Sequence, residues 1–237
     1  MTDLPPFPGF RPDALRFLAD LRDNNDREWF KPRKDTFDDE LMWPARCLVA
    51  DVAGRAARAG VPLTADPAKA IFRIYRDTRF SKNKAPYKTH VGLVWARPGQ
   101  KSGDQGALYA HVEPGGSFLG AGFWAPEPAL LRRFRERIAA DPAGWLAVVA
   151  EVRGADVDGG HVAVEGREPL KRMPRGYESF ADSDVADALR WKGAVATLPV
   201  PDEAVQRPDF AARVVAFAQA ALPLLAWGWA AGEPAGA

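Results

Sequence analysis

Residues 107–124 of the chain, ALYAHVEPGGSFLGAGFW, divide into two strand-like runs around Pro114-Gly115-Gly116. Both runs are rich in β-branched and aromatic side chains, which favour extended structure. A short Pro-Gly-Gly segment between two such runs favours a tight turn. We therefore predict a β-hairpin with strands at residues 107–113 and 117–124, so that at least part of the sheet is antiparallel.

Strand alternation gives this hairpin one face that is rich in polar groups. Tyr109, His111 and Glu113 fall on one side of the first strand because successive side chains point to opposite faces. Gly120 and Gly122 share a face of the return strand, where the missing side chains leave space for a ligand or for close backbone packing.

The sequence on either side of the hairpin predicts an α+β fold. A helical N-terminal region, a central sheet that is mainly antiparallel or mixed, and flanking helices follow from the hydrophobic periodicity, and no βαβ alternation indicates a Rossmann-like fold. We expect helices at residues 12–24, from Arg27 past Phe37, and at 45–59, 126–140, 142–152, 184–191 and 210–227, with further strands at 71–77, 89–96, 162–165 and 194–200.

Two local signals refine the helical N-terminal region. Asn25 and Glu28 have capping-box spacing, and Pro44 should break or kink the second helix. We expect one domain over residues 1–230 and a disordered tail at 231–237, because terminal segments without anchoring contacts fray.

Composition bounds the class of protein. The 237 residues are 47% hydrophobic and 27% charged, which argues against a largely disordered chain. The overall net charge of +1 predicts neither a nucleic-acid nor a membrane partner, although a local charged patch could still bind one. Cys47 is the single cysteine and excludes an intramolecular disulfide. The N-terminus lacks a secretory signal pattern, and we interpret residues 210–231 as a packed helix, so we expect a cytoplasmic protein.

The strongest local feature is a basic segment at residues 71–101. It carries eight Lys or Arg residues and one acid, Asp77, in a chain whose net charge is only +1. Arginine binds phosphate or carboxylate bidentately, and aromatic rings can stack on a base or a sugar. The candidate ligand-binding residues are Arg73, Tyr75, Arg76, Arg79, Lys84, Lys88 and Tyr109. The alternative interpretation is a solvated loop whose charges pair with acids elsewhere.

Six motifs stand out along the chain. They are Asn24-Asn25 followed by Trp29-Phe30; Arg73-Ile74-x-Arg76-Asp77-x-Arg79-Phe80-Ser81; Lys84-x-Pro86-Tyr87-Lys88; Tyr109-x-His111-x-Glu113-Pro114-Gly115-Gly116-Ser117; Gly120-x-Gly122-x-Trp124; and Leu170-Lys171-Arg172-x-Pro174-x-Gly176-Tyr177. Together they resemble the motifs of a bacterial and fungal family known as domain of unknown function 2461. Asn83 stands where many members would have Asp. The resemblance covers residues 7–205 and implies one continuous domain, but it supplies no reaction, substrate or catalytic residue.

The residues themselves suggest one catalytic constellation. His111 could act as a general acid or base, oriented by Glu113 or Asp77, if the strand at 71–77 lies beside the hairpin. The same three side chains could instead hold Mg²⁺ or Mn²⁺, or form a polar network that fixes the fold. His90 could join His111 in the sheet, but it is expected to be a hydrogen-bonded structural residue.

Our first hypothesis is a small anionic ligand held by the basic segment, with acid–base chemistry at His111, Glu113 and Asp77. The alternatives are a non-catalytic nucleic-acid-binding module, whose affinity would fall steeply with salt, and a protein-interaction domain. The sequence identifies neither a cofactor nor an oligomeric state, and it leaves open whether the protein is an enzyme.

Overall fold

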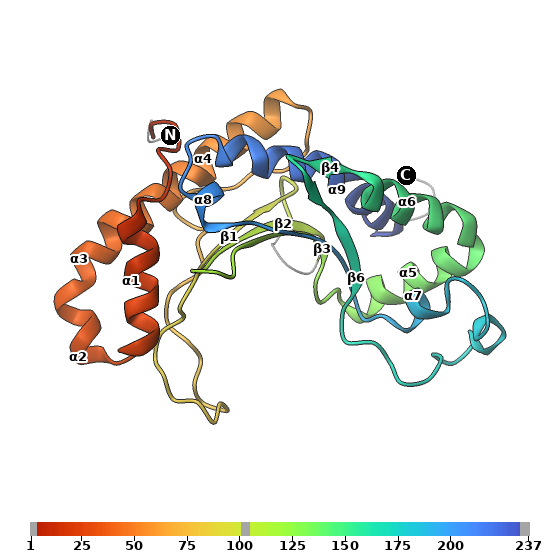
Figure 1. Ribbon diagram of the computed structural model, residues 1–237. Coiled ribbons are helices and arrows are strands. Elements are labelled where there is room, and N and C mark those ends of the chain that lie inside the picture. Colours follow the sequence, from red (N-terminus) through yellow and green to blue (C-terminus); the bar gives the residue numbers. More distant parts are fainter. Residues whose placement is uncertain (1–3, 101–104, 233–237) are drawn as a thin grey trace.

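The structure is a computed structural model that describes residues 4–100 and 105–232 (Figure 1). It confirms the α+β class. The helices are α1 (Pro12–Asp23), α2 (Arg27–Phe30), α3 (Lys34–Phe37), α4 (Trp43–Arg58), α5 (Pro128–Ala140), α6 (Pro142–Gly154), α7 (Ala186–Arg190), α8 (Asp202–Val205) and α9 (Phe210–Gly232). The strands are β1 (Val91–Ala96), β2 (Ala107–Val112), β3 (Phe118–Phe123), β4 (Asp156–Val157), β5 (Gly160–His161), β6 (Ala163–Gly166) and β7 (Ala194–Pro199).

Five of these strands form one sheet in the order β1-β2-β3-β7-β6, and every neighbouring pair is antiparallel. The expected hairpin is present as β2 and β3, with Tyr109 opposite Gly120 and His111 opposite Phe118. Gly120 in turn lies opposite Thr197 of β7, so a single row of side chains crosses the centre of the sheet.

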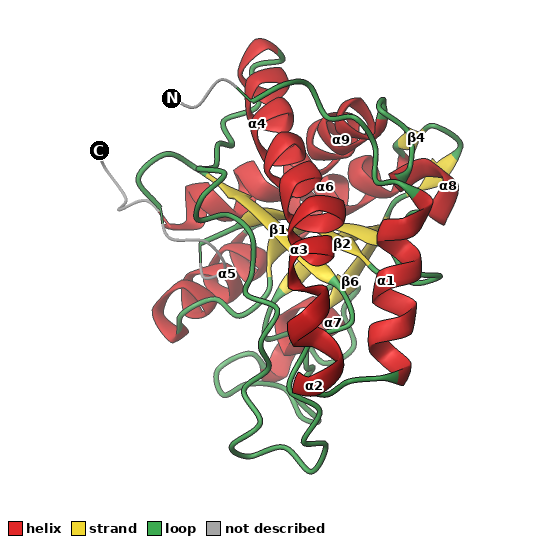
Figure 2. Ribbon diagram, turned by 90° about the vertical axis from the view of Figure 1, so that its left-hand side faces the viewer, coloured by secondary structure: helices red, strands yellow, loops and turns green. Residues whose placement is uncertain are grey.

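Helices cover one face of this sheet and leave the other open. Figures 1 and 2 both place α4 and α9 above the sheet and the loop at residues 71–88 below it. On the covered face, Leu93, Trp95, Leu108 and Ala110 are completely buried. The Trp95 indole nitrogen donates to the Val49 carbonyl at 3.1 Å, so the largest core side chain on β1 is also hydrogen-bonded to α4.

The segment at residues 71–77 is not the regular strand that we expected. It forms isolated antiparallel bridges from Ile71 to Leu93 and from Tyr75 to Tyr87. Beyond Ile74 the chain leaves the sheet and pairs with its own return segment, where the Arg76 amide donates to the Pro86 carbonyl at 2.9 Å. Pro86 has no N–H to donate, which prevents a continuous ladder. Alternation along residues 71–77 therefore does not bring Asp77 onto the sheet face that carries His111.

The N-terminal helices differ from the prediction at the expected Asn25 cap and at Pro44. The cap of α2 is Asp26 and not Asn25, since the Asp26 carboxylate accepts from the Trp29 amide at 2.8 Å. Pro44 does not break the helix: the chain continues from α3 through a π-helical turn, Asp38–Met42, into α4. A proline ring would clash with the carbonyl four residues earlier, and the wider π turn relieves that clash.

Helix α9 is longer than expected and runs through Gly232. Its length and composition alone would suit a membrane span, yet 61% of its most apolar window is buried inside the protein, as a core helix would be. Residues 231 and 232, which were expected in the tail, therefore belong to α9, and residues 233–237 lie outside the described residues.

Candidate functional site

The open face of the sheet contains a hollow of about 420 Å³, which we call the sheet hollow. Its walls are mostly apolar and come from four strands and the adjoining segments. They comprise Phe72, Val94, Ala107, Tyr109, His111, Phe118, Gly120, Ala121, Gly122, Trp124, Val195 and Thr197. An apolar hollow with a few polar groups is the usual form of a small-molecule site.

Glycines create the space in and around this hollow. A Cβ at Gly92 would lie 2.7 Å from the Tyr109 hydroxyl, so only glycine lets the Tyr109 ring lie across β1. Gly120 lies opposite Tyr109, and its position has no side chain to fill the hollow. The space expected from the glycines of β3 is therefore present on the same face as Tyr109 and His111.

Three side chains on this face form a hydrogen-bonded chain. The Tyr109 hydroxyl lies 2.9 Å from Nδ1 of His111, and Nε2 of His111 lies 3.2 Å from Oε2 of Glu113. A carboxylate can only accept, so we assign the proton of His111 to Nε2, which leaves Nδ1 to accept from Tyr109. The polar face predicted for the hairpin is thus a directed chain from Tyr109 to Glu113.

Further contacts of its backbone and its side chain hold Glu113 at the end of β2. Its backbone amide donates to the Ser117 hydroxyl at 3.0 Å, and its Oε1 accepts from the Thr89 hydroxyl at 3.0 Å. Arg22 of α1 approaches the same oxygen at 3.5 Å. Burial by itself raises the pKa of Glu113, but the hydrogen bonds from His111 and Thr89 outweigh it and bring the pKa below its ordinary value. Glu113 is therefore ionised at neutral pH.

His90 lies directly before β1 and packs against His111 with 4.1 Å between ring centroids. Burial, assisted by the adjacent His111, lowers the pKa of His90 to about 4. Burial also lowers the pKa of His111, although Glu113 opposes that shift, and burial raises the pKa of Tyr109 to about 12. Both imidazoles and the Tyr109 hydroxyl are therefore uncharged at neutral pH.

Asp77 does not join this constellation. It lies in the exposed loop and forms an ion pair with Arg79 at 2.7 Å. Within the described residues, no contact connects Asp77 with His111 or Glu113. The grouping of His111, Glu113 and Asp77 expected from the sequence is wrong because the 71–77 segment leaves the sheet before Asp77.

Much of the basic segment supports its own loop. Arg76 donates to the Ala85 carbonyl at 3.1 Å, and Lys84 donates to the Thr78 carbonyl at 2.9 Å. Tyr75 contacts Tyr87 and is 59% exposed. These contacts favour a structural role for part of the segment, but Arg76 and Lys84 bond carbonyls of their own loop and not the acids elsewhere that the alternative interpretation expected. Lys101 of that segment lies outside the described residues.

Two aromatic walls of the sheet hollow each carry a cation. The Lys88 ammonium lies 5.5 Å from the centroid of the Phe72 ring, and the Arg167 guanidinium lies 3.4 Å from the Trp124 ring. Burial, together with the charge of Arg73, lowers the pKa of Lys88. Nε of Arg167 is buried and has no hydrogen-bond partner among the residues that the structure describes. Of the expected ligand residues, Lys88 and Tyr109 are therefore at the hollow or beside it.

Comparison with known proteins gives a family and no closer relative. The sequence profile described as "Conserved hypothetical protein (DUF2461)" matches residues 13–227. The chain belongs to the DUF2461 family. No curated protein and no solved structure matches this DUF2461 protein. The matched range contains both the sheet hollow and the chain from Tyr109 to Glu113, so the site lies within the part of the sequence that defines the family.

Sequence reasoning missed several residues of the DUF2461 site. Thr89 and Arg22 support Glu113, Phe118 stacks on His111 with 4.7 Å between ring centroids, and Arg167 covers Trp124. The only local signal was the Thr89-His90 pair at the start of a strand. The remaining residues are distant in sequence and meet only through the fold.

The arrangement offers two kinds of chemistry. The hydrogen-bonded chain can transfer a proton between the hollow and His111, with Glu113 stabilising the charged imidazole. Alternatively, His90, His111 and Glu113 each offer a ligand atom, and these atoms all lie within 4.8 Å of one another, which would suit a metal ion.

Proposed function

We propose that this DUF2461 protein binds a small organic anion with an apolar body in the sheet hollow and acts on it beside Tyr109 and His111. The observation that carries the proposal is the coincidence of an apolar hollow, two cation-bearing aromatic walls and a polar chain on one sheet face. Pockets of this composition bury the apolar body of a ligand while a few polar groups fix its orientation.

Arg167 is the cation that best supports an anionic ligand. Its guanidinium stacks on Trp124, a wall of the hollow, while its buried Nε lacks a partner within the described residues. A buried polar donor without a partner is costly, and a carboxylate or phosphate oxygen would satisfy it. Lys88 beside Phe72 supplies a second positive charge for the same kind of group.

The proposal includes the acid–base role expected for His111 and Glu113, but Asp77 takes no part in it. A ligand atom at the Tyr109 hydroxyl could give up a proton while Tyr109 passes its own proton to Nδ1 of His111. Glu113 would stabilise the resulting imidazolium, as the carboxylate does in a catalytic triad.

A ligand screen with paired arginine variants tests the proposal. Purified protein would be heated with aromatic carboxylates, short-chain carboxylates and phosphate monoesters, and hits would be titrated calorimetrically. A ligand at about 100 times its Kd should raise Tm by roughly 5 to 10 °C. Arg167→Ala should weaken a hit by roughly 10-fold or more, because hydrogen bonds to charged groups contribute about 1.5 to 3 kcal/mol.

Arg172→Ala is the matched control, because Arg172 is an exposed arginine in the same connecting segment. It should leave binding unchanged. If no small anion binds, or if Arg167→Ala and Arg172→Ala have equal effects, the hollow is not the anion site.

The loop at residues 71–88, which belongs to the basic segment, supports nucleic acid as a second candidate ligand. Phe80 at its tip is 96% exposed beside Arg79, and exposed aromatics among cations can stack on unpaired bases. Titration with a short single-stranded RNA distinguishes the two functions. A nucleic-acid module predicts affinity that falls steeply with salt and is lost in Phe80→Ala, with no response to Arg167→Ala.

A further inference from the structure

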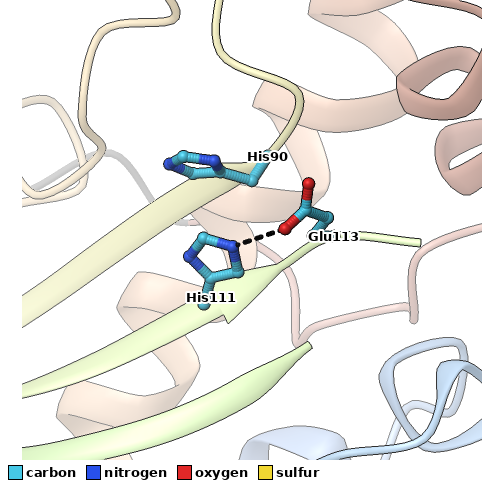
Figure 3. Close-up of side chains that lie close together, drawn as sticks. All are labelled: His90, His111 and Glu113. Carbon is cyan, nitrogen blue, oxygen red and sulfur yellow. Dashed lines mark hydrogen bonds and ion pairs between the residues drawn. The ribbon is translucent and has the colours of Figure 1, made fainter. Parts of the chain in front are cut away.

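The side chains of His90, His111 and Glu113 converge at one end of the open sheet face (Figure 3). His90 comes from the residue before β1, while His111 lies in β2 and Glu113 directly follows it. All three are half-buried. Two imidazoles and one carboxylate are the protein ligands of catalytic zinc sites and of non-haem iron sites.

His90 is the member that the protein's own contacts leave unexplained. Its ring packs against His111, yet neither ring nitrogen has a hydrogen-bond partner within residues 4–100 and 105–232. Neither nitrogen is fully buried, so each stays accessible to water or to a ligand. A neutral imidazole has a nitrogen lone pair that can bind a metal, and a ring nitrogen of His90 lies within 4.8 Å of ligand atoms of His111 and Glu113.

The surroundings of the other two ligands provide the outer contacts that metal sites normally have. The Tyr109 hydroxyl bonds Nδ1 of His111, the nitrogen on the far side of the ring from Glu113. The Thr89 hydroxyl bonds Oε1 of Glu113 and leaves Oε2 directed at His111. Such partners orient ligands and fix the tautomer of the imidazole.

We propose that His90, His111 and Glu113 bind a first-row divalent cation such as Zn²⁺ or Fe²⁺. His111 changes tautomer by proton exchange with solvent when the cation binds: Nε2 loses its proton and binds the cation, and Nδ1 gains a proton that it donates to the Tyr109 oxygen. Imidazole ligands favour zinc, iron and nickel over Mg²⁺, which prefers oxygen. The donor set therefore differs from the Mg²⁺ or Mn²⁺ site considered from the sequence with Asp77.

Three protein ligands leave coordination positions open. His111 also lines the sheet hollow, so a molecule in the hollow can reach the cation. The cation site shares this location with the proposed function but does not depend on the organic ligand. With the cation bound, Nε2 of His111 is coordinated and Nδ1 is already protonated, so His111 no longer accepts the proton of Tyr109, and polarisation of the ligand by the cation takes over that role.

Direct metal titration tests the site without any organic ligand. The full-length protein would be freed of metal with a chelator and titrated with Zn²⁺ by calorimetry, and with Co²⁺ by visible absorption. We expect one equivalent bound, and Co²⁺ bands typical of nitrogen and oxygen ligands. His90→Ala should weaken Zn²⁺ by more than about 100-fold, beyond the 10- to 100-fold cost of losing an outer contact. Glu113→Gln, which preserves the shape of the side chain, should weaken it similarly.

His161→Ala is the matched control, since His161 is an exposed histidine in β5. It should bind Zn²⁺ like the parent protein, and circular dichroism should confirm that all three variants fold. If the parent protein binds no Zn²⁺, or if His90→Ala binds as tightly as His161→Ala, the site does not exist. Because no organic anion is present, these outcomes are separate from success or failure of the Arg167 test.

Discussion

Gly120 lies directly opposite Tyr109 in the β2–β3 ladder, and a Cβ at Gly120 would meet nothing closer than the Phe118 ring at 3.7 Å. Position 120 can therefore carry a side chain, and that side chain would enter the sheet hollow. Gly120→Leu should abolish binding of any organic anion found in the screen, while Gly120→Ala should reduce it much less. Calorimetric titration measures both, and unchanged affinity in Gly120→Leu would place the ligand elsewhere.

Gly122 should respond differently from Gly120, although both face the hollow. The backbone at Gly122 has φ of +143°, and a Cβ there would lie 2.3 Å from the Ala194 carbonyl oxygen. The strained φ belongs to the Gly122 backbone and the clash is with the backbone of Ala194, so no side chain can rotate to relieve either. Gly122→Ala should destabilise the fold by more than about 2 kcal/mol, and Gly120→Ala should stay within about 1 kcal/mol. Urea denaturation checks this pair, and equal losses would contradict the backbone geometry.

The β2–β3 hairpin was predictable because its signals are local. Alternating side chains and a Pro-Gly-Gly turn specify the pairing of residues close in sequence, and Tyr109, His111 and Glu113 share one face as expected. Residues 71–77 failed for the opposite reason. Their composition is typical of a strand, but only Ile71 pairs with the sheet, at Leu93. The partners of the remaining residues depend on the path of the loop, which the local sequence does not specify.

The site was only partly predictable for the same reason. His111 and Glu113 are two residues apart, so strand alternation alone places them together. His90 reaches them only because β1 pairs with β2 in a register that puts Gly92 opposite His111. Asp77 also lies in a motif rich in charged residues, but the neighbouring sequence did not indicate that its loop would turn away from the sheet.

Asn25 connects the helical N-terminal region to the basic loop. Its side chain accepts from the Tyr87 amide at 3.0 Å and donates to the Tyr87 carbonyl at 3.1 Å. Asn25→Asp keeps the acceptor but replaces the donor with an oxygen that faces the carbonyl. The free energy of unfolding should fall by about 2 kcal/mol. Chemical denaturation measures it, with exposed Asn83→Asp as the control: Asn83 accepts from the Ala85 amide, an aspartate keeps that bond, and stability should change by no more than about 0.5 kcal/mol. Equal effects would mean that the Tyr87 contact does not hold the loop.

Cys47 should report on opening of the core. It lies in α4 with no exposed surface, and burial raises the pKa of its thiol. Its reaction with a thiol reagent in native buffer should be slower than in urea by a factor of roughly 1,000 or more, since exposing it costs on the order of 5 kcal/mol. Urea-unfolded protein should give one reactive thiol per chain. Fast labelling of the native protein would show that α4 opens locally.

Tyr109→Phe isolates the hydroxyl that bonds His111 while keeping the ring that lines the hollow. Loss of this bond leaves Nδ1 of half-buried His111 without its partner, so the protein should lose about 1 kcal/mol of stability. The variant should also bind Zn²⁺ about 10- to 100-fold more weakly, because the ligand is no longer held in orientation by its outer partner. Tyr75→Phe is the matched control, as the Tyr75 side chain is mostly exposed and is not part of the hydrogen-bonded chain. A stability loss with unchanged Zn²⁺ affinity would show that the Tyr109 hydroxyl supports the fold alone and does not orient His111 toward a cation.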